Sequence, residues 1–171
     1  MTSYHKDLFD WVVIIFLATH IPITLWMDAQ SLWKDVPAMT WTVPQFMVDI
    51  AADYAESSGD FLANPAVAPL WFKSILAAEY FLQLPFFVYA LIAWLRSWNA
   101  PGLRAACIAY GAHVATTLVP IMAEFYFATS LSSEQRVFLL GIYSPYLILP
   151  LAIMARAGAR PVLFPGKSKA A

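Results

Sequence analysis

Two carboxyl side chains stand out because each falls in a long apolar stretch. Asp28 closes the first such stretch, and Glu79 lies about nine residues into the second, roughly 13 Å along a helix at 1.5 Å per residue. An ionisable group at that depth in a membrane helix is costly to bury and is a functional candidate by default. The ordinary alternatives are a solvated helix end for Asp28 and a protonated, hydrogen-bonded Glu79.

Facing each other across a cavity, these two acids would do chemistry that neither does alone. Two close carboxyls cannot both ionise cheaply, so we expect the pair to share a proton. Such a pair can hold a protonated amine, hydrogen-bond a hydroxyl group or shuttle a proton.

Further polar and proline residues repeat at intervals of three or four, which places them on one face of a helix. In lipid such faces must turn inward, because an unpaired polar group in hydrocarbon costs several kcal/mol. Four inward stripes predict a polar-lined interior. The stripes are His20, Thr24 and Asp28; Glu79 and Gln83; His113, Thr117, Pro120 and Glu124; and Tyr143, Tyr146 and Pro150.

Metal and cofactor chemistry have little support in the sequence. His20 and His113 each lack a second His or Cys at ligand spacing, and Cys107 is the single cysteine. We therefore expect neither a metal site nor a cofactor, and we assign no catalytic residue. His20 is expected to hydrogen-bond an acid or a carbonyl freed by a proline.

The elements that must carry these residues are membrane helices. Hydrophobic residues make up 61% of the 171-residue chain and charged residues 12%, well outside the range of soluble domains. Four stretches reach the roughly 20 residues needed to span a bilayer. The net charge of −1 and the absence of a basic run argue against nucleic acid as a partner. The predicted fold is one all-α domain over 1–171, with transmembrane helices at 8–27, 70–95, 103–127 and 137–155.

Every predicted helix contains proline, which removes one backbone donor and displaces the carbonyl four residues earlier. Kinks in all four helices would bow them apart and open a cavity, although each kink could also serve packing alone. The prolines are Pro22, Pro85, Pro120, Pro145 and Pro150.

The long connection, residues 29–69, differs from the other loops in its charge. Its charged residues are mostly acidic, whereas those of the second loop and of the segment after the fourth helix are all basic. The positive-inside rule then places both termini in the cytosol and the connection on the lumenal side. Within it, residues 45–54 have the spacing of a short amphipathic helix lying against the bundle. A serine, Ser132 or Ser133, is expected to cap the fourth helix.

The segments resemble the sigma-2 receptor (transmembrane protein 97) family, within the emopamil-binding protein, or EXPERA, superfamily. The similarity runs from about residue 11 to 155. It rests on HIPITLWMD at 20–28, WFKS at 71–74, Glu79, QLPFF at 83–87, Tyr110, His113, TTLVPI at 116–121 and PYL at 145–147.

The resemblance implies a four-helix bundle with a lumen-side pocket, located in the endoplasmic reticulum membrane and forming homodimers. It implies sterols or amphiphilic amines as ligands, a link to cholesterol homeostasis, and a sterol-transport protein as a possible partner. The ligand-binding residues it implies are Asp28, Glu79, Gln83, Thr117, Tyr146 and, as support, His20. Glu124 departs from the family pattern.

Three functions follow from this reading. The leading hypothesis is a non-enzymatic sterol- and amine-binding receptor. The second is a sterol double-bond isomerase in which Glu79, Asp28 and Glu124 supply acid and base, although the isomerase's own His and Glu pattern has no match here. The third is a structural membrane adaptor whose pocket is filled by lipid.

Overall fold

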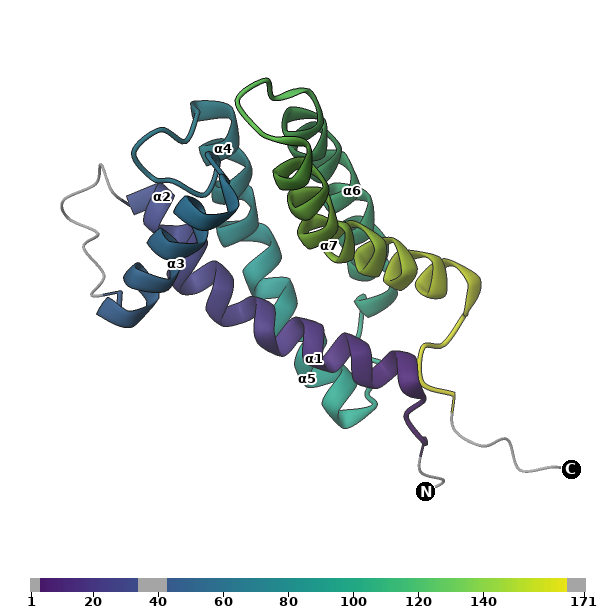
Figure 1. The fold of residues 1–171 in the computed structure, drawn as a ribbon. Coiled ribbons are helices and arrows are strands. Elements are labelled where there is room, and N and C mark those ends of the chain that lie inside the picture. Colours follow the sequence, from purple (N-terminus) through teal and green to yellow (C-terminus); the bar gives the residue numbers. More distant parts are fainter. Residues whose placement is uncertain (1–3, 34–42, 166–171) are drawn as a thin grey trace, which may run out of the picture.

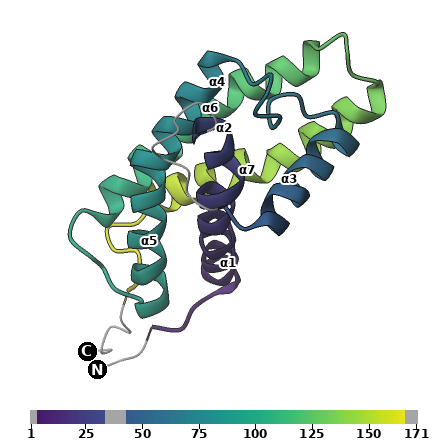
Figure 2. The ribbon, with the colours of Figure 1, turned by 90° about the vertical axis from the view of Figure 1, so that its left-hand side faces the viewer.

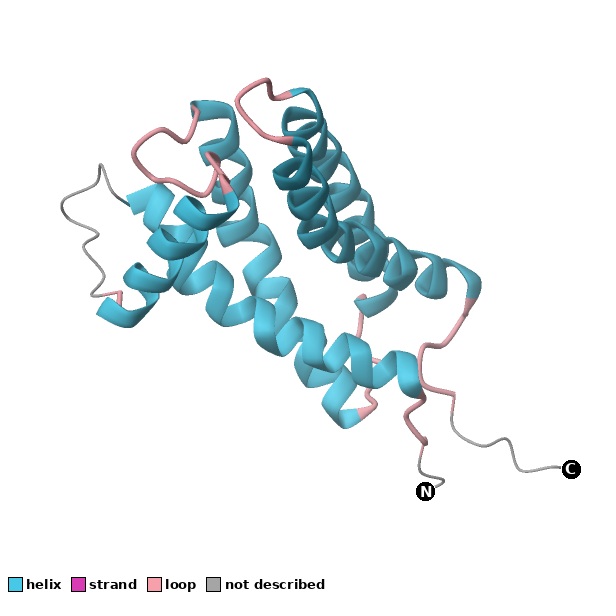
Figure 3. Cartoon of the chain, viewed as in Figure 1, coloured by secondary structure: helices cyan, strands magenta, loops and turns pink. Residues whose placement is uncertain are grey.

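Four long helices form the molecule, and each is long enough to cross a membrane. The computed structural model describes residues 4–33 and 43–165. The four helices contain 25 to 27 residues each, more than the roughly 20 that a bilayer requires. All regular secondary structure in these two ranges is helical (Figure 3). The predicted all-α bundle of four spanning helices is confirmed.

Two of the four helices are interrupted by a wider, π-helical turn. The first helix consists of α1 (Leu8–Pro22), a π turn (Ile23–Asp28) and α2 (Ala29–Trp33). The second consists of α4 (Leu70–Ala78), a π turn (Glu79–Gln83) and α5 (Leu84–Arg96). The others are α6 (Leu103–Phe127) and α7 (Ser133–Ala159), and α3 (Gln45–Ser58) lies in the long connection.

The first helix extends beyond its predicted end at residue 27, as far as Trp33. No glycine or proline interrupts residues 29–33, and the backbone N–H of Ala29 donates to the Thr24 carbonyl, which carries the helical pairing past Asp28. The side-chain amide of Gln30 also donates to the Trp26 carbonyl at 2.8 Å. The prediction that Asp28 closes this helix was therefore wrong.

The other boundaries follow local capping signals. The fourth helix starts at Ser133 rather than 137, because the Ser132 hydroxyl accepts from the Gln135 backbone and the Gln135 side chain accepts from Ser132 in return. The predicted cap at this serine pair is confirmed. The predicted amphipathic helix is also present and continues to Ser58, where Gly59 ends it at a φ of 73°.

Both π turns lie next to a proline. Pro22 directly precedes the first, and Pro85 follows the second by two residues. A proline removes one intrahelical hydrogen bond, and the wider turn restores the pairing over five residues. Thus the N–H of Leu84 donates to the carbonyl of Glu79. Four of the five polar residues singled out in these helices, Thr24, Asp28, Glu79 and Gln83, therefore lie in a π turn, and His20 lies in α1 just before Pro22.

The helices pack as two pairs that meet at one end and diverge at the other. The α6 and α7 helices lie side by side, as do α1 and α5 (Figure 1). The start of α1 and the end of α7 lie at one end of the bundle, here called the proximal end. The opposite, distal end carries the α6–α7 turn, and α3 packs against the distal part of the first helix and against α7 (Figure 2).

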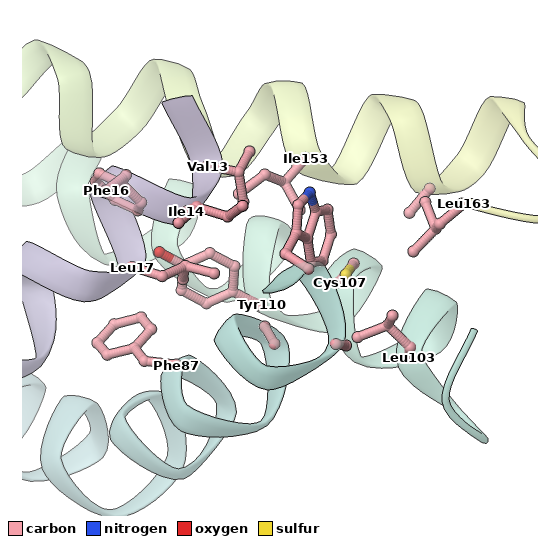
Figure 4. Packing of buried hydrophobic residues seen from close by; sticks show 14 of the residues in the cluster. Val13, Ile14, Phe16, Leu17, Phe87, Leu103, Cys107, Tyr110, Ile153 and Leu163 are labelled. Atoms are coloured by element: carbon pink, nitrogen blue, oxygen red, sulfur yellow. The ribbon is translucent and has the colours of Figure 1, made fainter. Parts of the chain in front are cut away.

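Two separate apolar clusters hold the bundle together. The proximal cluster joins all four helices, and Figure 4 shows Leu17, Phe87, Tyr110 and Ile153 converging in it. The distal cluster joins α4, α6, α7 and the connection. It consists of Leu62, Phe72, Leu76, Ile121, Phe125, Leu131 and Leu139.

A partly buried ion-pair network joins two helices at the proximal end. The Arg156 guanidinium of α7 lies 2.9 Å from the carboxylate of Asp10, which is fully buried, and 3.2 Å from that of Asp7. It also donates to the Tyr4 hydroxyl at 2.8 Å. The two aspartates form the capping box at the start of α1, so this network ties α1 directly to α7.

Candidate functional site

A cavity of about 240 Å³ lies between the two apolar clusters. This is larger than the engineered cavity of about 150 Å³ that holds benzene, so an organic group fits in it. Its apolar wall comes from residues of the first π turn, α3, α4, α6 and α7. Its polar lining consists of His20, Asp28, Ser31, Tyr54, Glu79, Gln83, Tyr110, Thr117, Tyr143 and Tyr146.

The two π turns present polar groups to this cavity from adjacent helices. Thr24 and Asp28 belong to the first turn, and Glu79 and Gln83 belong to the second. Since π turns change the direction in which neighbouring side chains point, they are frequent at functional sites. The proline-linked irregularities thus fall at the level of the candidate site.

Glu79 is fixed by two donors from the first helix. Its Oε1 atom accepts from the Thr24 hydroxyl at 2.8 Å and lies 3.1 Å from the Nε2 atom of His20. Both contacts join the same oxygen. Among the residues that the structure describes, no donor contacts Oε2, so this second oxygen remains available to a cavity occupant.

His20 is held by aromatic rings on three sides. The ring centroids of Phe16, Phe87 and Tyr146 lie 5.0, 4.6 and 5.0 Å from that of the imidazole. Its Nδ1 atom is buried and has no hydrogen-bond partner within the described ranges. A proton on Nδ1 would be a buried donor without an acceptor, so the neutral ring is best assigned with its proton on Nε2, donating to Glu79.

Asp28 lies on the cavity wall within electrostatic range of two other acids, Glu79 and Asp60. Coulomb repulsion between like charges is strong where water is excluded. The cavity therefore favours an occupant that brings a positive charge or a shareable proton.

Asp60 joins the long connection to α3 and α7. Its buried carboxylate accepts from the hydroxyls of Tyr54 at 2.9 Å and Tyr143 at 2.8 Å, both on Oδ2. Its Oδ1 atom accepts from the backbone N–H groups of Leu62 and Ala63. This carboxylate thus accepts four hydrogen bonds, and both tyrosines line the cavity.

Charge and burial also act on Tyr54, which lies outside the spanning helices. Burial raises the pKa of its hydroxyl above the ordinary value, and the nearby Asp60 carboxylate raises it further. The Tyr54 hydroxyl therefore stays protonated at neutral pH and donates its hydrogen bond to Asp60.

The structure brings all six predicted site residues to the same cavity. Asp28, Glu79 and His20 form its acidic side, and Gln83, Thr117 and Tyr146 complete the lining from α4–α5, α6 and α7. Whether these residues bind a ligand stays a prediction.

The predicted inward stripe of the third helix was only partly right. Thr117 lines the cavity, but Pro120 and Glu124 lie exposed on the outside of the bundle. The inward face is carried by Ile121 and Phe125, one residue and therefore about 100° further round the helix. Glu124 is thus removed from the group of acids available for proton transfer in the cavity.

His113 does not line the cavity, although it was predicted to face inward. Its Nε2 atom is buried without a partner in the part of the chain that the structure describes. Tyr110, one turn earlier, lines the cavity instead.

Sequence reasoning missed the role of Asp60 and Tyr54. Both sit in the acidic connection, where an aspartate after Ser58-Gly59 reads as a solvated turn residue. The available signal was local: Asp60 accepts from the N–H groups two and three residues later, as turn aspartates do. Its contact with Tyr143 joins residues 83 positions apart and has no local signal.

No group of three or more His, Cys, Asp or Glu side chains arranged to hold a metal ion occurs in residues 4–33 and 43–165. The chemistry of the site is that of carboxyl, imidazole, hydroxyl and amide groups.

Comparison with known proteins agrees with this architecture. The family model EXPERA (expanded EBP superfamily) matches residues 46–157. The sigma intracellular receptor 2 of Xenopus tropicalis is 35% identical over 156 residues, covering 86% of each chain. The human sigma intracellular receptor 2 is 33% identical over 156 residues, covering 85% of this chain and 84% of its own.

A more distant similarity extends to a yeast protein. The efficient mitochondria targeting-associated protein 19 of Saccharomyces cerevisiae is 28% identical over 165 residues, covering 86% of this chain and 94% of its own. The family match, the receptor similarity and the four spanning helices agree with one another. The chain is a multi-pass membrane protein that belongs to the EXPERA family and is similar to the sigma-2 receptors.

Proposed function

We propose that this protein binds sterols and cationic amphiphiles in its intramembrane cavity, as a sigma-2-like receptor linked to sterol homeostasis. One observation carries the proposal: the Glu79 carboxyl group lines an otherwise largely apolar cavity with one oxygen held by His20 and Thr24. The second oxygen faces no described donor. A ligand amine would supply the missing donor.

The charges in and around the cavity favour a cation over a neutral or anionic guest. Asp28 lies within electrostatic range of both Glu79 and Asp60. A protonated amine placed between Asp28 and Glu79 relieves their repulsion and forms charge-assisted hydrogen bonds. An anionic guest would add to the repulsion.

The apolar wall would supply most of the affinity. It includes Ile23, Phe72, Leu76, Val114 and Ile121. Burial of apolar surface contributes about 25 cal/mol per Å², so a hydrocarbon body gains several kcal/mol here. Gln83, Thr117 and Tyr146 would orient the ligand through their polar groups.

The contact between His20 and Glu79 supports a second candidate function, that of a sterol double-bond isomerase. An imidazole and a carboxyl group 3.1 Å apart in a buried site form an acid–base pair, and the EXPERA superfamily includes sterol isomerases. In this reading Asp28 and Glu79 move the protons. Glu124 takes no part, because it lies outside the cavity.

One experiment separates these functions. The full chain is purified in mild detergent, incubated with a panel of sterols that includes Δ8 forms, and the sterols are identified by mass spectrometry. The receptor reading predicts unchanged sterols that co-purify with the protein. Catalytic formation of shifted double bonds would reject the receptor reading in favour of the isomerase, and sterols that are neither retained nor converted would reject both sterol functions.

The orientation in the membrane is part of the same proposal. The proximal end carries exposed arginines, whereas exposed acids lie on α3 at the distal end. This distribution supports the proposal that both termini lie in the cytosol, by the positive-inside rule, and we propose the endoplasmic reticulum as the membrane. Because Cys107 is fully buried, single cysteines introduced at Arg160 and Asp53 can be labelled with an impermeant maleimide in sealed vesicles. Labelling at Asp53 without permeabilisation would reject this orientation.

Homodimer formation and a sterol-transport protein as partner are further parts of the proposal. They rest on the similarity to sigma-2 receptors alone. Native mass spectrometry of the full chain tests the first, and affinity capture with and without sterol tests the second.

A further inference from the structure

Glu124 occupies an unusual position on the outer surface of the bundle. It is the one acidic residue of α6, it is exposed, and it lies three residues before the end of that helix at Phe127. At 1.5 Å per residue this is roughly 5 Å from the helix end, which is the depth of lipid head groups in a spanning helix. The helix below it presents exposed apolar residues such as Val119 to the lipid.

No charged partner explains this carboxylate. Among residues 4–33 and 43–165, none forms an ion pair or hydrogen bond with Glu124. The group is also outside the cavity, so the proposed function does not use it. Because no described residue pairs with it, this carboxylate at head-group depth is free to pair with a cationic group of a membrane lipid.

The surroundings of Glu124 form an open hollow on the distal surface. It is lined by Phe127, which is 75% exposed, and by Phe61 of the connection. The hydroxyl-bearing Thr129 and Ser130 and the ring of Pro120 also line it. The hollow therefore combines one negative charge, two aromatic rings, two hydroxyls and an apolar exit along α6.

We propose that this hollow binds the amine head group of a zwitterionic membrane phospholipid. Glu124 pairs with the cationic amine, and the rings of Phe61 and Phe127 stabilise it through cation–π contacts. The hydroxyls of Thr129 and Ser130 are donors suited to the phosphate oxygens. The acyl chains continue from Pro120 along the apolar outer face of α6.

The chemistry of the hollow separates this guest from other membrane components. An anionic head group such as phosphatidylglycerol offers no cation to Glu124 and adds a repulsive charge. A sterol offers a hydroxyl but no charge to pair. A lipid is favoured over a second protein, because the carboxylate lies at head-group depth and the hollow opens along a lipid-facing helix.

The test is lipid retention by the full chain, measured by native mass spectrometry in mild detergent. Phosphatidylcholine and phosphatidylglycerol with the same acyl chains are titrated onto the wild type, Glu124→Gln and Phe127→Leu. Glu134→Gln is the matched control, because Glu134 is an exposed acid of the same distal region outside the hollow. Binding of a cationic amphiphile to the internal cavity confirms that each variant is folded.

We expect the wild type to retain phosphatidylcholine in preference to phosphatidylglycerol. Glu124→Gln should weaken phosphatidylcholine binding about fivefold and Phe127→Leu about threefold, in line with the usual strength of ion-pair and cation–π contacts at exposed sites. Glu134→Gln should change nothing. Equal retention of the two lipids, unaltered binding in Glu124→Gln, or an equal loss in Glu134→Gln would overturn the proposal. A change in the number of protomers in Glu124→Gln would also overturn it, by identifying the hollow as a contact between copies of the chain.

Discussion

Replacing Asp60 tests whether its buried carboxylate stabilises the packing of α3 and the long connection against α7, beside the cavity. In Asp60→Ala, the hydroxyls of Tyr54 and Tyr143 lose bonds of 2.9 and 2.8 Å. The backbone N–H groups of Leu62 and Ala63 lose acceptors at 3.1 and 3.0 Å. Hydrogen bonds to a charged group contribute about 1.5–3 kcal/mol each, and an unpaired buried donor costs about 1–3 kcal/mol.

The four terms share one acceptor and are not additive. We therefore expect Asp60→Ala to lower the free energy of unfolding by roughly 5 kcal/mol, close to the lower end of the simple sum. Asp60→Asn retains one acceptor oxygen for the backbone and loses the charge, so roughly 2 kcal/mol is expected. Tyr143→Phe removes a single bond and should cost about 1.5 kcal/mol.

The assay is unfolding of the full chain in detergent, followed by circular dichroism, together with equilibrium binding of a cationic amphiphile. The predicted order of destabilisation is Asp60→Ala, then Asp60→Asn, then Tyr143→Phe. Ligand binding should weaken in the same order, because Tyr54 and Tyr143 line the cavity. A fully stable Asp60→Ala variant would refute the idea that this carboxylate fastens α3 to α7. Loss of stability with normal ligand affinity would refute the link between this fastening and the cavity.

Two further predictions concern packing and pH. A Cβ atom on Gly111 would lie 2.6 Å from the carbonyl oxygen of Pro150, so Gly111→Ala should destabilise by about 1–3 kcal/mol. Gly141→Ala is the control, because nothing lies within 4 Å of its added Cβ, and a destabilised control with a stable Gly111→Ala would contradict this reading. Burial raises the pKa of Asp7, but the Asp10 backbone N–H and the Arg156 guanidinium outweigh burial, so this pKa lies below its ordinary value. The carboxylate then stabilises the fold above about pH 4, and this contribution is lost as the pH falls further, so acid unfolding curves should be shallower in Asp7→Asn.

Much of the fold follows from local features of the sequence. The lengths of the apolar stretches gave the four spanning helices, and the serine before the fourth helix gave its cap. The positions of Pro22 and Pro85 indicated irregular helices, but not that the irregularity takes the form of π turns. That outcome depends on which hydrogen bonds reform after each proline, and neighbouring helices decide this.

The candidate site was predictable where helical spacing alone places residues on one face. His20 and Asp28 sit two turns apart and both reach the cavity, as do Glu79 and Gln83. The same spacing failed for Glu124, because the inward face at the distal end is set by the packing of Phe125, about 100° away.

Contacts between segments far apart in the chain could not be predicted from the sequence. The position of Asp60 after Gly59 marks it as a turn residue, but nothing in the acidic connection shows that Asp60 is buried and bonded to α7 while Asp53, on α3, is exposed. Their difference arises only when the connection folds back on α7.

The most direct test of the acid-lined cavity is the dissociation constant of a cationic amphiphile measured beside that of an uncharged sterol. Wild type, Asp28→Asn and Glu79→Gln are compared with Asp53→Asn, which neutralises an exposed acid outside the cavity. Because hydrogen bonds to a charged group contribute about 1.5–3 kcal/mol, each cavity variant should weaken amphiphile binding by roughly tenfold or more. Sterol binding should change much less, and Asp53→Asn should match the wild type. Unchanged amphiphile affinity in both cavity variants would contradict the account.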